Sequence, residues 1–402
     1  MVYLASSGFW LNLNFAVVSI LSLLLSIAFA NLLPKNEYGI YQYVLAIAAF
    51  LTAFTFTGLN TAITQAVANG REGVLRTSVR IQLAWNMIPA GVALFGAIYY
   101  FVQGNAVLGF GLACVALSLP LTNAFNSYAA FLTGKKDFRS SALYAIAGNA
   151  LYYCAIFVGV FFFPAAAPLI FINLFVTAAA AATLYYWTLR VCKPNNTDDD
   201  QVLPYARHLT GMNVLGMIAA HVDKILVFQF LGAASLASYA LAILLPERLG
   251  GAFKSILLAA FPRFSNRSLT EIRQSIYWKS FLILLLTLGC ASAYALVAPS
   301  VLRILYPEYL DIIPYSQVYA FTFVATIAHL VTMAFVAHKR LKELYIFNTA
   351  VPLLQISALV IGISLWGLWG LVAARILSSV CACILALALL QFGGKDSAPI
   401  AA

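Results

Sequence analysis

Residues 281–298 read FLILLLTLGCASAYALVA and carry no charged side chain over eighteen positions. A helix needs about 20 mostly apolar residues to cross the hydrocarbon core of a bilayer, so this stretch predicts a membrane span over 277–299. The whole chain has the same character, because 63% of its 402 residues are hydrophobic and only 9% are charged. Soluble domains carry about 25% charged residues. The sequence therefore predicts a polytopic membrane protein.

Twelve such apolar runs follow one another along the chain, which predicts an all-α fold. Their limits are 7–32, 39–66, 79–102, 106–133, 141–163, 167–190, 208–231, 236–262, 277–299, 312–338, 344–364 and 367–391. The longest connection is 191–207, which is too short for an aqueous domain. This organisation is typical of a transporter rather than of an anchored enzyme.

The basic residues test this count of spans, because Lys and Arg concentrate in short cytoplasmic loops. Seventeen of the 23 fall in even-numbered loops or the C-terminal tail, whereas the odd-numbered loops hold only Lys35 and Arg303. We therefore expect both termini to be cytoplasmic. The net charge of +10 is sparse and interrupted by apolar runs, so it does not indicate a nucleic-acid partner.

The connection at 192–207 divides the chain into nearly equal parts, 1–191 and 208–402. Residues 33–41 align weakly with 231–239, at an offset of 198 positions. These two segments fall at equivalent places in the count of spans. The sequence thus predicts two six-helix bundles, related as parallel repeats, around a central cavity.

Six charged residues lie inside predicted spans, where each costs about 2.5–3.5 kcal/mol on insertion scales unless it faces the protein interior or water. They are the basic Lys224, Arg248, Lys254 and Arg375 and the acidic Asp223 and Glu247. The excess of basic residues predicts an electropositive interior in the second half of the chain. Pro246, beside Gly250 and Gly251, favours a kinked or partly unwound helix there.

Structural roles compete with functional ones at these positions. Asp223 with Lys224, or Glu247 with Arg248, fits an ion pair that holds helices together. Lys254 fits a side chain that extends to the cytoplasmic interface. His329 fits a hydrogen-bonded packing residue better than a proton relay.

Uncharged polar residues provide a second set of candidates. Asn60 and Gln65 lie in the second span, and Asn213 shares a helical face with Lys224 in the seventh. Such residues often only join helices. The alternative is a wall of amides that contacts sugar, and both interpretations remain open.

Motifs of soluble enzymes are missing. The chain has no P-loop, no nucleophile elbow and no HExxH, and its six cysteines have no metal-binding spacing. We expect no metal and no cofactor. Asp198, Asp199 and Asp200 form an acidic run that we interpret as solvated.

Several short segments resemble those of bacterial polysaccharide flippases, the O-antigen type of lipid-linked oligosaccharide flippase in the multidrug/oligosaccharidyl-lipid/polysaccharide exporter superfamily. The similar segments are 32–41 (LLPKNEYGIY), 58–65 (GLNTAITQ), 223–232 (DKILVFQFLG), 261–265 (FPRFS), 306–309 (YPEY) and 367–370 (GLWG). Their order and positions extend the resemblance over nearly the whole chain. Gln65 stands where the family often has Arg, so one basic side chain of the family is absent.

The resemblance implies that the chain moves an undecaprenyl-pyrophosphate-linked oligosaccharide from the cytoplasmic to the periplasmic leaflet by alternating access. Lys224, Arg248, Lys254 and Arg375 then become candidate contacts of the pyrophosphate or of acidic sugars, with Asn60, Gln65 and Asn213 beside them. Asp223 and Glu247 become candidates for coupling to a proton or sodium gradient. The implied partners are this substrate, the membrane lipids and the polysaccharide polymerase machinery.

Two other functions are open to a chain of this kind. One is a multidrug or small-molecule ion-coupled antiporter of the same superfamily, although a cationic drug favours an acidic interior. The other is a membrane glycosyltransferase or polymerase. Such an enzyme needs a sizeable periplasmic loop with catalytic acids, and the longest odd-numbered loop, 299–311, offers only Glu308 and Asp311.

Overall fold

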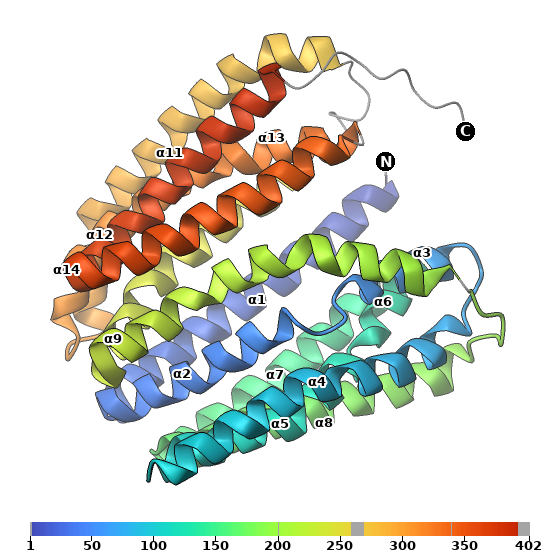
Figure 1. The fold of residues 1–402 in the computed structure, drawn as a ribbon, viewed down its shortest axis with the longest axis horizontal. Helices are drawn as coiled ribbons and strands as arrows, with labels where there is room; N and C mark the ends of the chain where they lie inside the picture. The colour runs from blue at the N-terminus through green and yellow to red at the C-terminus, as the bar shows by residue number, and fades with distance from the viewer. Residues whose placement is uncertain (1, 200, 259–268, 339, 393–402) are drawn as a thin grey trace. The chain divides into compact units, whose positions relative to one another are not determined.

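The computed structural model describes residues 2–199, 201–258, 269–338 and 340–392, and every regular element in these ranges is a helix (Figure 1). In chain order the elements are α1 (Val2–Leu32), α2 (Lys35–Thr52), α3 (Gly58–Ala68), α4 (Val74–Val102), α5 (Ala106–Phe125), α6 (Ser127–Gly134), α7 (Phe138–Phe162), α8 (Ala166–Cys192), α9 (Val202–Leu258), α11 (Leu269–Leu305), η1 (Leu310–Ile312), α12 (Ile313–Tyr319), η2 (Ala320–Val324), α13 (Ala325–Ala337) and α14 (Leu341–Phe392). The predicted all-α membrane fold is confirmed.

Within the described ranges, nine helical segments are long and apolar enough to cross a membrane, compared with twelve predicted spans. The difference has two causes. The backbone leaves helical geometry at Gly232 in α9 and at Gly367 in α14, so each of these long helices contains two predicted spans. The remaining span, 39–66, is broken between α2 and α3, and neither piece reaches the required length and apolarity.

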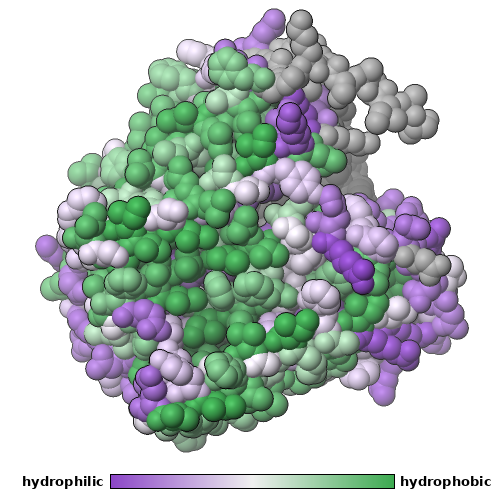
Figure 2. Space-filling model, viewed as in Figure 1, coloured by the Kyte–Doolittle hydropathy of each residue, from purple (hydrophilic) through white to green (hydrophobic). Residues whose placement is uncertain are grey.

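The described chain forms two compact units. The first unit holds residues 1–240 and 305–308, and the second holds 241–304 and 309–402. The predicted division into 1–191 and 208–402 concerns six-helix bundles and stays a prediction. In the surface view of Figure 2, hydrophobic residues cover most of the visible face, and hydrophilic residues of the first unit lie mainly at its two ends. This distribution suits helices that cross a membrane.

The segment at 32–41 packs against several other helices of the first unit. Gly39 in α2 lies so close to α9 that a Cβ atom on it would overlap the backbone carbonyl of Ala233, the residue after Gly232. Phe29 stacks on Tyr38, with ring centroids 5.2 Å apart. Glu37 accepts a hydrogen bond from the backbone N–H of Ala166 at 2.6 Å, at the start of α8. The similarity to flippases at this segment therefore reflects packing.

The connection that follows α8 is bound to the connection between α3 and α4. The Gly73 N–H donates to the Thr197 carbonyl at 2.9 Å, and a Cβ atom on Gly73 would lie 2.8 Å from that oxygen. Asn195 Oδ1 accepts from the Glu72 N–H at 3.1 Å, and the Asn195 N–H donates to Glu72 Oε2 at 3.1 Å. Three side-chain pairs add to this: Arg71 with Asp199, Arg76 with Asn196 (2.7 Å) and Thr77 with Asp198 (2.6 Å).

These contacts correct the interpretation of the acidic run as solvated for Asp199 only, because Asp198 is exposed. Asp198 accepts a hydrogen bond, and the ion-paired Asp199 side chain is only 12% exposed. Asp200 lies outside the described residues. Lys135, which follows α6, pairs with Glu72 at 2.6 Å. Three of the basic loops thus meet at one end of the first unit, as the alternation of basic and non-basic loops predicts.

The contact of Gly39 with α9 predicts that Gly39→Ala lowers the free energy of unfolding by about 1–3 kcal/mol, because the added methyl group overpacks against backbone. The measurement is the midpoint of thermal unfolding in detergent. Gly91→Ala is the matched control, since a Cβ atom there meets open space and alanine favours a helix over glycine by about 1 kcal/mol. Equal midpoints for the two variants would contradict this packing.

The surroundings of Glu72 predict a dependence on pH. Burial raises the pKa of Glu72, but the hydrogen bonds from Lys135 and from the Asn195 N–H outweigh it, so that the pKa lies below its ordinary value. A carboxylate with a lowered pKa stabilises the fold above its ordinary pKa, and this contribution is lost as the pH falls through the lowered value. We expect amide exchange at 195–199, corrected for intrinsic rates, to accelerate below about pH 4. Glu72→Gln should show fast exchange already at about pH 7.

Candidate functional site

Two of the predicted cationic residues line one cavity of the second unit. Lys254 comes from α9 and Arg375 from α14, although 121 positions separate them in the sequence. The cavity has a volume of about 210 Å³. Its other lining residues are Ala325, Ala328, His329, Thr332, Phe347, Val351, Gln355, Ser378, Ser379 and Ala382. Among the described residues, no carboxylate belongs to this lining, so the lining is electropositive.

The hairpin shape of α14 brings its two arms to this cavity (Figure 1). Gly367 adopts φ 58° and interrupts the helix. A Cβ atom on Gly362 would overlap the carbonyl of Gly370, so the two arms touch through backbone. Gln355 from the first arm and Arg375 from the second can therefore line the same cavity. This close approach accounts for the glycines of the segment 367–370.

The hydroxyl groups of the cavity are oriented by their own helices. Ser378 and Ser379 donate to the Arg375 carbonyl at 3.0 and 2.8 Å. Thr332 donates to the His329 carbonyl at 3.0 Å. Because each hydroxyl proton is used inside its helix, the oxygen atoms offer lone pairs to a ligand. Hydrogen-bond donors come instead from Lys254, Arg375 and the amide of Gln355.

Sequence reasoning missed part of this cavity. His329 was expected to be a packing residue, and Thr332 and Gln355 were not candidates. Helical periodicity groups the lining residues on single helix faces. One face of α14 presents Arg375, Ser378, Ser379 and Ala382. One face of α13 presents Ala325, Ala328, His329 and Thr332. Which faces meet depends on the hairpin at Gly367, and spacing along the chain does not specify that.

Glu247 and Arg248 also belong to the second unit but do not line the cavity. The Glu247 side chain is exposed and accepts a hydrogen bond from the Tyr319 hydroxyl at 3.2 Å. The partial unwinding predicted at Pro246 is wrong, because α9 keeps helical φ and ψ angles there and departs from them at Gly232, whereas the alternative of a kink at Pro246 stays a prediction. A buried proline within α9 removes one backbone donor without ending the helix.

The other candidates lie in the first unit. Asp223 is fully buried, and its two carboxylate oxygens accept hydrogen bonds from the Tyr239 hydroxyl at 2.7 Å and from the Lys224 N–H at 2.8 Å. Tyr239 follows Gly232 and Asp223 precedes it, so their bond joins the two sides of the break in α9. The Lys224 side chain is half-buried.

The three amide candidates also belong to the first unit, and all three are exposed. Gln65 in α3 donates to the Tyr205 hydroxyl of α9 at 3.1 Å. Asn60 in α3 and Asn213 in α9 lie near the contact of these two helices, where the Gly58 N–H donates to Thr210 Oγ1 at 3.0 Å. The candidates are thus divided between the two units, and among those of the second unit only Lys254 and Arg375 line the cavity.

The chain matches one known protein family and several solved structures. The sequence model of the family described as "Polysaccharide biosynthesis protein" matches residues 4–268. No curated protein matches the chain by sequence. Among solved structures, a multidrug resistance MATE family transporter of the MOP superfamily is similar in its inward-facing conformation. The TM-score is 0.68 at 15% identity, over 94% of this chain and 96% of that one. The outward-facing conformation of such a transporter gives a TM-score of 0.63 at 14% identity, over 96% and 97%.

A third similar structure is a MOP superfamily transporter from Pyrococcus furiosus, whose title states that the reverse polarity of its binding pocket suggests a different function. It gives a TM-score of 0.61 at 16% identity and covers 96% of each chain. At these identities the likeness shows the fold alone. The family match covers about two thirds of the chain, so the protein belongs to the polysaccharide biosynthesis protein family and has the fold of the MOP superfamily transporters.

Proposed function

We propose that this chain is a transporter, not an enzyme, and that it moves a polyprenyl-pyrophosphate-linked oligosaccharide from the cytoplasmic to the periplasmic leaflet of a bacterial inner membrane. Membership of the polysaccharide biosynthesis protein family supports a saccharide substrate. The observation that carries the proposal is the cavity of the second unit, where Lys254 and Arg375 meet without a lining carboxylate.

Physical chemistry links this cavity to the proposed substrate. A pyrophosphate does not cross about 30 Å of hydrocarbon without compensating charge. Arginine binds phosphate with its fixed fork of donors, and lysine adds a point charge. The polyprenyl tail is itself apolar and needs no polar cavity. Lys224 and Arg248, with Asn60, Gln65 and Asn213, remain proposed further contacts along the path.

A multidrug antiporter is the second candidate, because MATE transporters share the fold. The cavity argues against a cationic drug, since Lys254 and Arg375 would repel it. The two functions therefore differ in the sign of the charge that the ligand carries. Drug resistance on overexpression, with normal surface polysaccharide in a deletion strain, would favour the antiporter.

Removing one cation of the cavity tests the proposal. We expect Arg375→Gln and Lys254→Gln each to reduce binding of an undecaprenyl-pyrophosphate-linked saccharide about tenfold or more, since a hydrogen bond to a charged group contributes about 1.5–3 kcal/mol. Native mass spectrometry of the protein with the lipid measures this. In a deletion strain the same variants should let lipid-linked repeat units accumulate.

Arg303→Gln is the matched control, because Arg303 is an exposed basic residue of the second unit that does not line the cavity. It should bind the lipid as the parent does, at an equal protein level. Unchanged binding in both cavity variants would remove Lys254 and Arg375 from the site.

The two acidic candidates for ion coupling differ in environment, and this generates a further prediction. Asp223→Asn places an amide where the Lys224 N–H donates or where the Tyr239 hydroxyl donates, so we expect a lower midpoint of thermal unfolding. Glu247→Gln, at an exposed side chain, should leave that midpoint unchanged. If Glu247 couples transport to a proton or sodium gradient, Glu247→Gln should fold normally but transport without any dependence on that gradient. Asp223→Asn should instead act through the stability of the fold. A gradient dependence that survives in Glu247→Gln would exclude that role.

A further inference from the structure

The segment of α9 before Gly232 is fixed to the first unit at its beginning. Gly58 approaches α9 so closely that a Cβ atom on it would lie 2.8 Å from the Leu209 Cβ, and its N–H donates to Thr210 Oγ1. The preceding linker is bound through Glu72 and Gly73, as described above. The start of this helix therefore has backbone and side-chain contacts with α3 and with the connection between α3 and α4.

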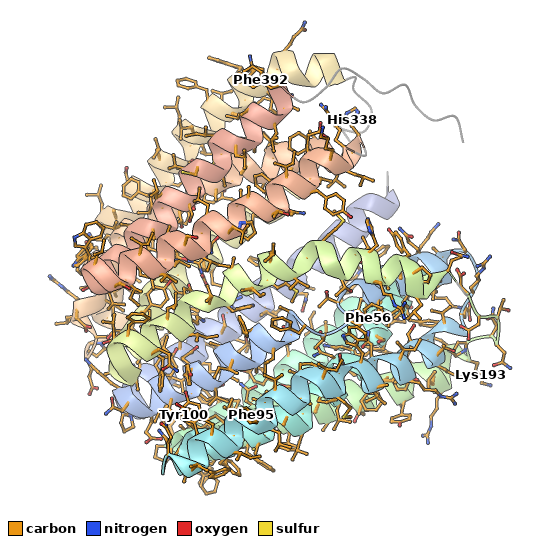
Figure 3. All side chains as sticks on the ribbon, viewed as in Figure 1. Phe56, Phe95, Tyr100, Lys193, His338 and Phe392 are labelled. Atoms are coloured by element: carbon orange, nitrogen blue, oxygen red, sulfur yellow. The ribbon has the colours of Figure 1, made fainter. Side chains whose placement is uncertain are left out.

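The other end of the same segment is also fixed to the first unit. Phe228 stacks on Tyr43 of α2, with ring centroids 3.8 Å apart and planes 11° apart. Gln229 donates to the hydroxyls of Tyr43 at 2.5 Å and Tyr100 at 3.1 Å. Figure 3 shows Tyr100 and Lys193 at opposite ends of this unit, so the contacts hold the segment over its length.

The chain passes between the two units at three places, Ala240–Leu241, Ile304–Leu305 and Glu308–Tyr309. The short segment 305–308 is anchored on α1, because the hydroxyls of Ser26 and Tyr306 are 2.7 Å apart and Asn31 donates to the Leu305 carbonyl at 3.2 Å. The linker at 193–201 is not one of these passages. Ile304–Leu305 and Glu308–Tyr309 fall in the odd-numbered loop 299–311 of the predicted topology, whereas Ala240–Leu241 falls inside the predicted span 236–262.

We propose that the linker 193–201 and the helix segment 202–231 move as one body with the first unit, and that the transport cycle pivots at 232–241 and at the two ends of 305–308. The moving first body then contains seven membrane helices rather than six. Asn213, Asp223 and Lys224 travel with it, whereas Lys254 and Arg375 travel with the second unit. This inference rests on the proposed transport function.

The first experiment is independent of transport. Hydrogen exchange in the full-length protein should be at least about tenfold slower than intrinsic rates at the amides of Asn195 and Thr197, which donate hydrogen bonds to Glu72 Oε2 and Asn195 Oδ1, as in a hydrogen-bonded segment rather than a flexible tether. Asn195→Ala should accelerate this exchange, because it removes the contacts with Glu72 and Gly70. Arg190→Ala, at an exposed basic residue just before the linker, is the matched control and should leave it unchanged. Exchange at intrinsic rates in the parent would overturn the proposal.

The second experiment fastens the linker covalently. In a chain whose six cysteines are replaced, Thr77→Cys and Asp198→Cys are joined by a short thiol-cleavable cross-linker, because these two side chains already touch. Transport of an undecaprenyl-pyrophosphate-linked saccharide into proteoliposomes should stay within about twofold of the uncross-linked protein. The two single-cysteine variants, treated alike, control for the reagent. Loss of transport that a reductant restores would show that the linker must detach, which contradicts the proposal.

The pivot itself is tested at Gly232, which has φ 85° and ψ 178°. An L-residue is strained in that region, so Gly232→Ala should reduce transport about tenfold or more while exchange at Asn195 and Thr197 stays slow. Transport equal to the parent would exclude a pivot there. If the parent itself transports nothing while its linker exchanges slowly, the proposed function fails and the seven-helix body stands.

Discussion

Each backbone N–H and C=O inside hydrocarbon needs a partner within the protein, because an unsatisfied group costs several kcal/mol. This requirement governs where the helices of the chain are interrupted. At the break between α2 and α3, the N–H groups of 53–55 bond to carbonyls three residues earlier. The Phe54 carbonyl accepts from the indole N–H of Trp85 at 3.1 Å. At the two other breaks, Gly232 and Gly367 take positive φ angles without the cost of a Cβ atom.

Those glycine breaks in turn decide which charges meet. The break at Gly367 returns α14 along its own path, so that Arg375 shares a cavity with residues of its first arm and with Lys254. The break at Gly232 is joined by the bond between Asp223 and Tyr239. One break thus helps to build an electropositive cavity, whereas the carboxylate beside the other break is bound within the fold.

Much of the fold was predictable, because apolar length and loop charge are properties of local sequence. The twelve runs lie largely in helices where the structure describes them, although the run 39–66 is interrupted between α2 and α3, and the basic loops of the first unit meet as predicted. The extent of the two units was not predictable from span counts. The contacts that bind 202–231 to the first unit, such as Phe228 on Tyr43, join residues 185 positions apart, and no local pattern announces them.

The site was predictable in part for a related reason. A Lys or Arg inside an apolar run is costly, so its position carries a signal by itself, and Lys254 and Arg375 do line one cavity. An uncharged residue such as Gln355 or Thr332 costs much less free energy inside a span, so its presence in the sequence does not indicate a site. His329 was interpreted as a packing residue because only the tertiary structure brings it to the two cations.

The serine hydroxyls of α14 have a consequence for selectivity. Both hydroxyl groups donate their protons to the Arg375 carbonyl. The two cations of the cavity therefore donate hydrogen bonds to a ligand, whereas the serine oxygens accept them. A fully ionised phosphate group satisfies the cations but has no proton to donate to the serine oxygens. A molecule that carries an anionic group next to free hydroxyls satisfies both kinds of partner at once. Under the proposed function, this division favours a ligand in which an anionic group lies next to sugar hydroxyls.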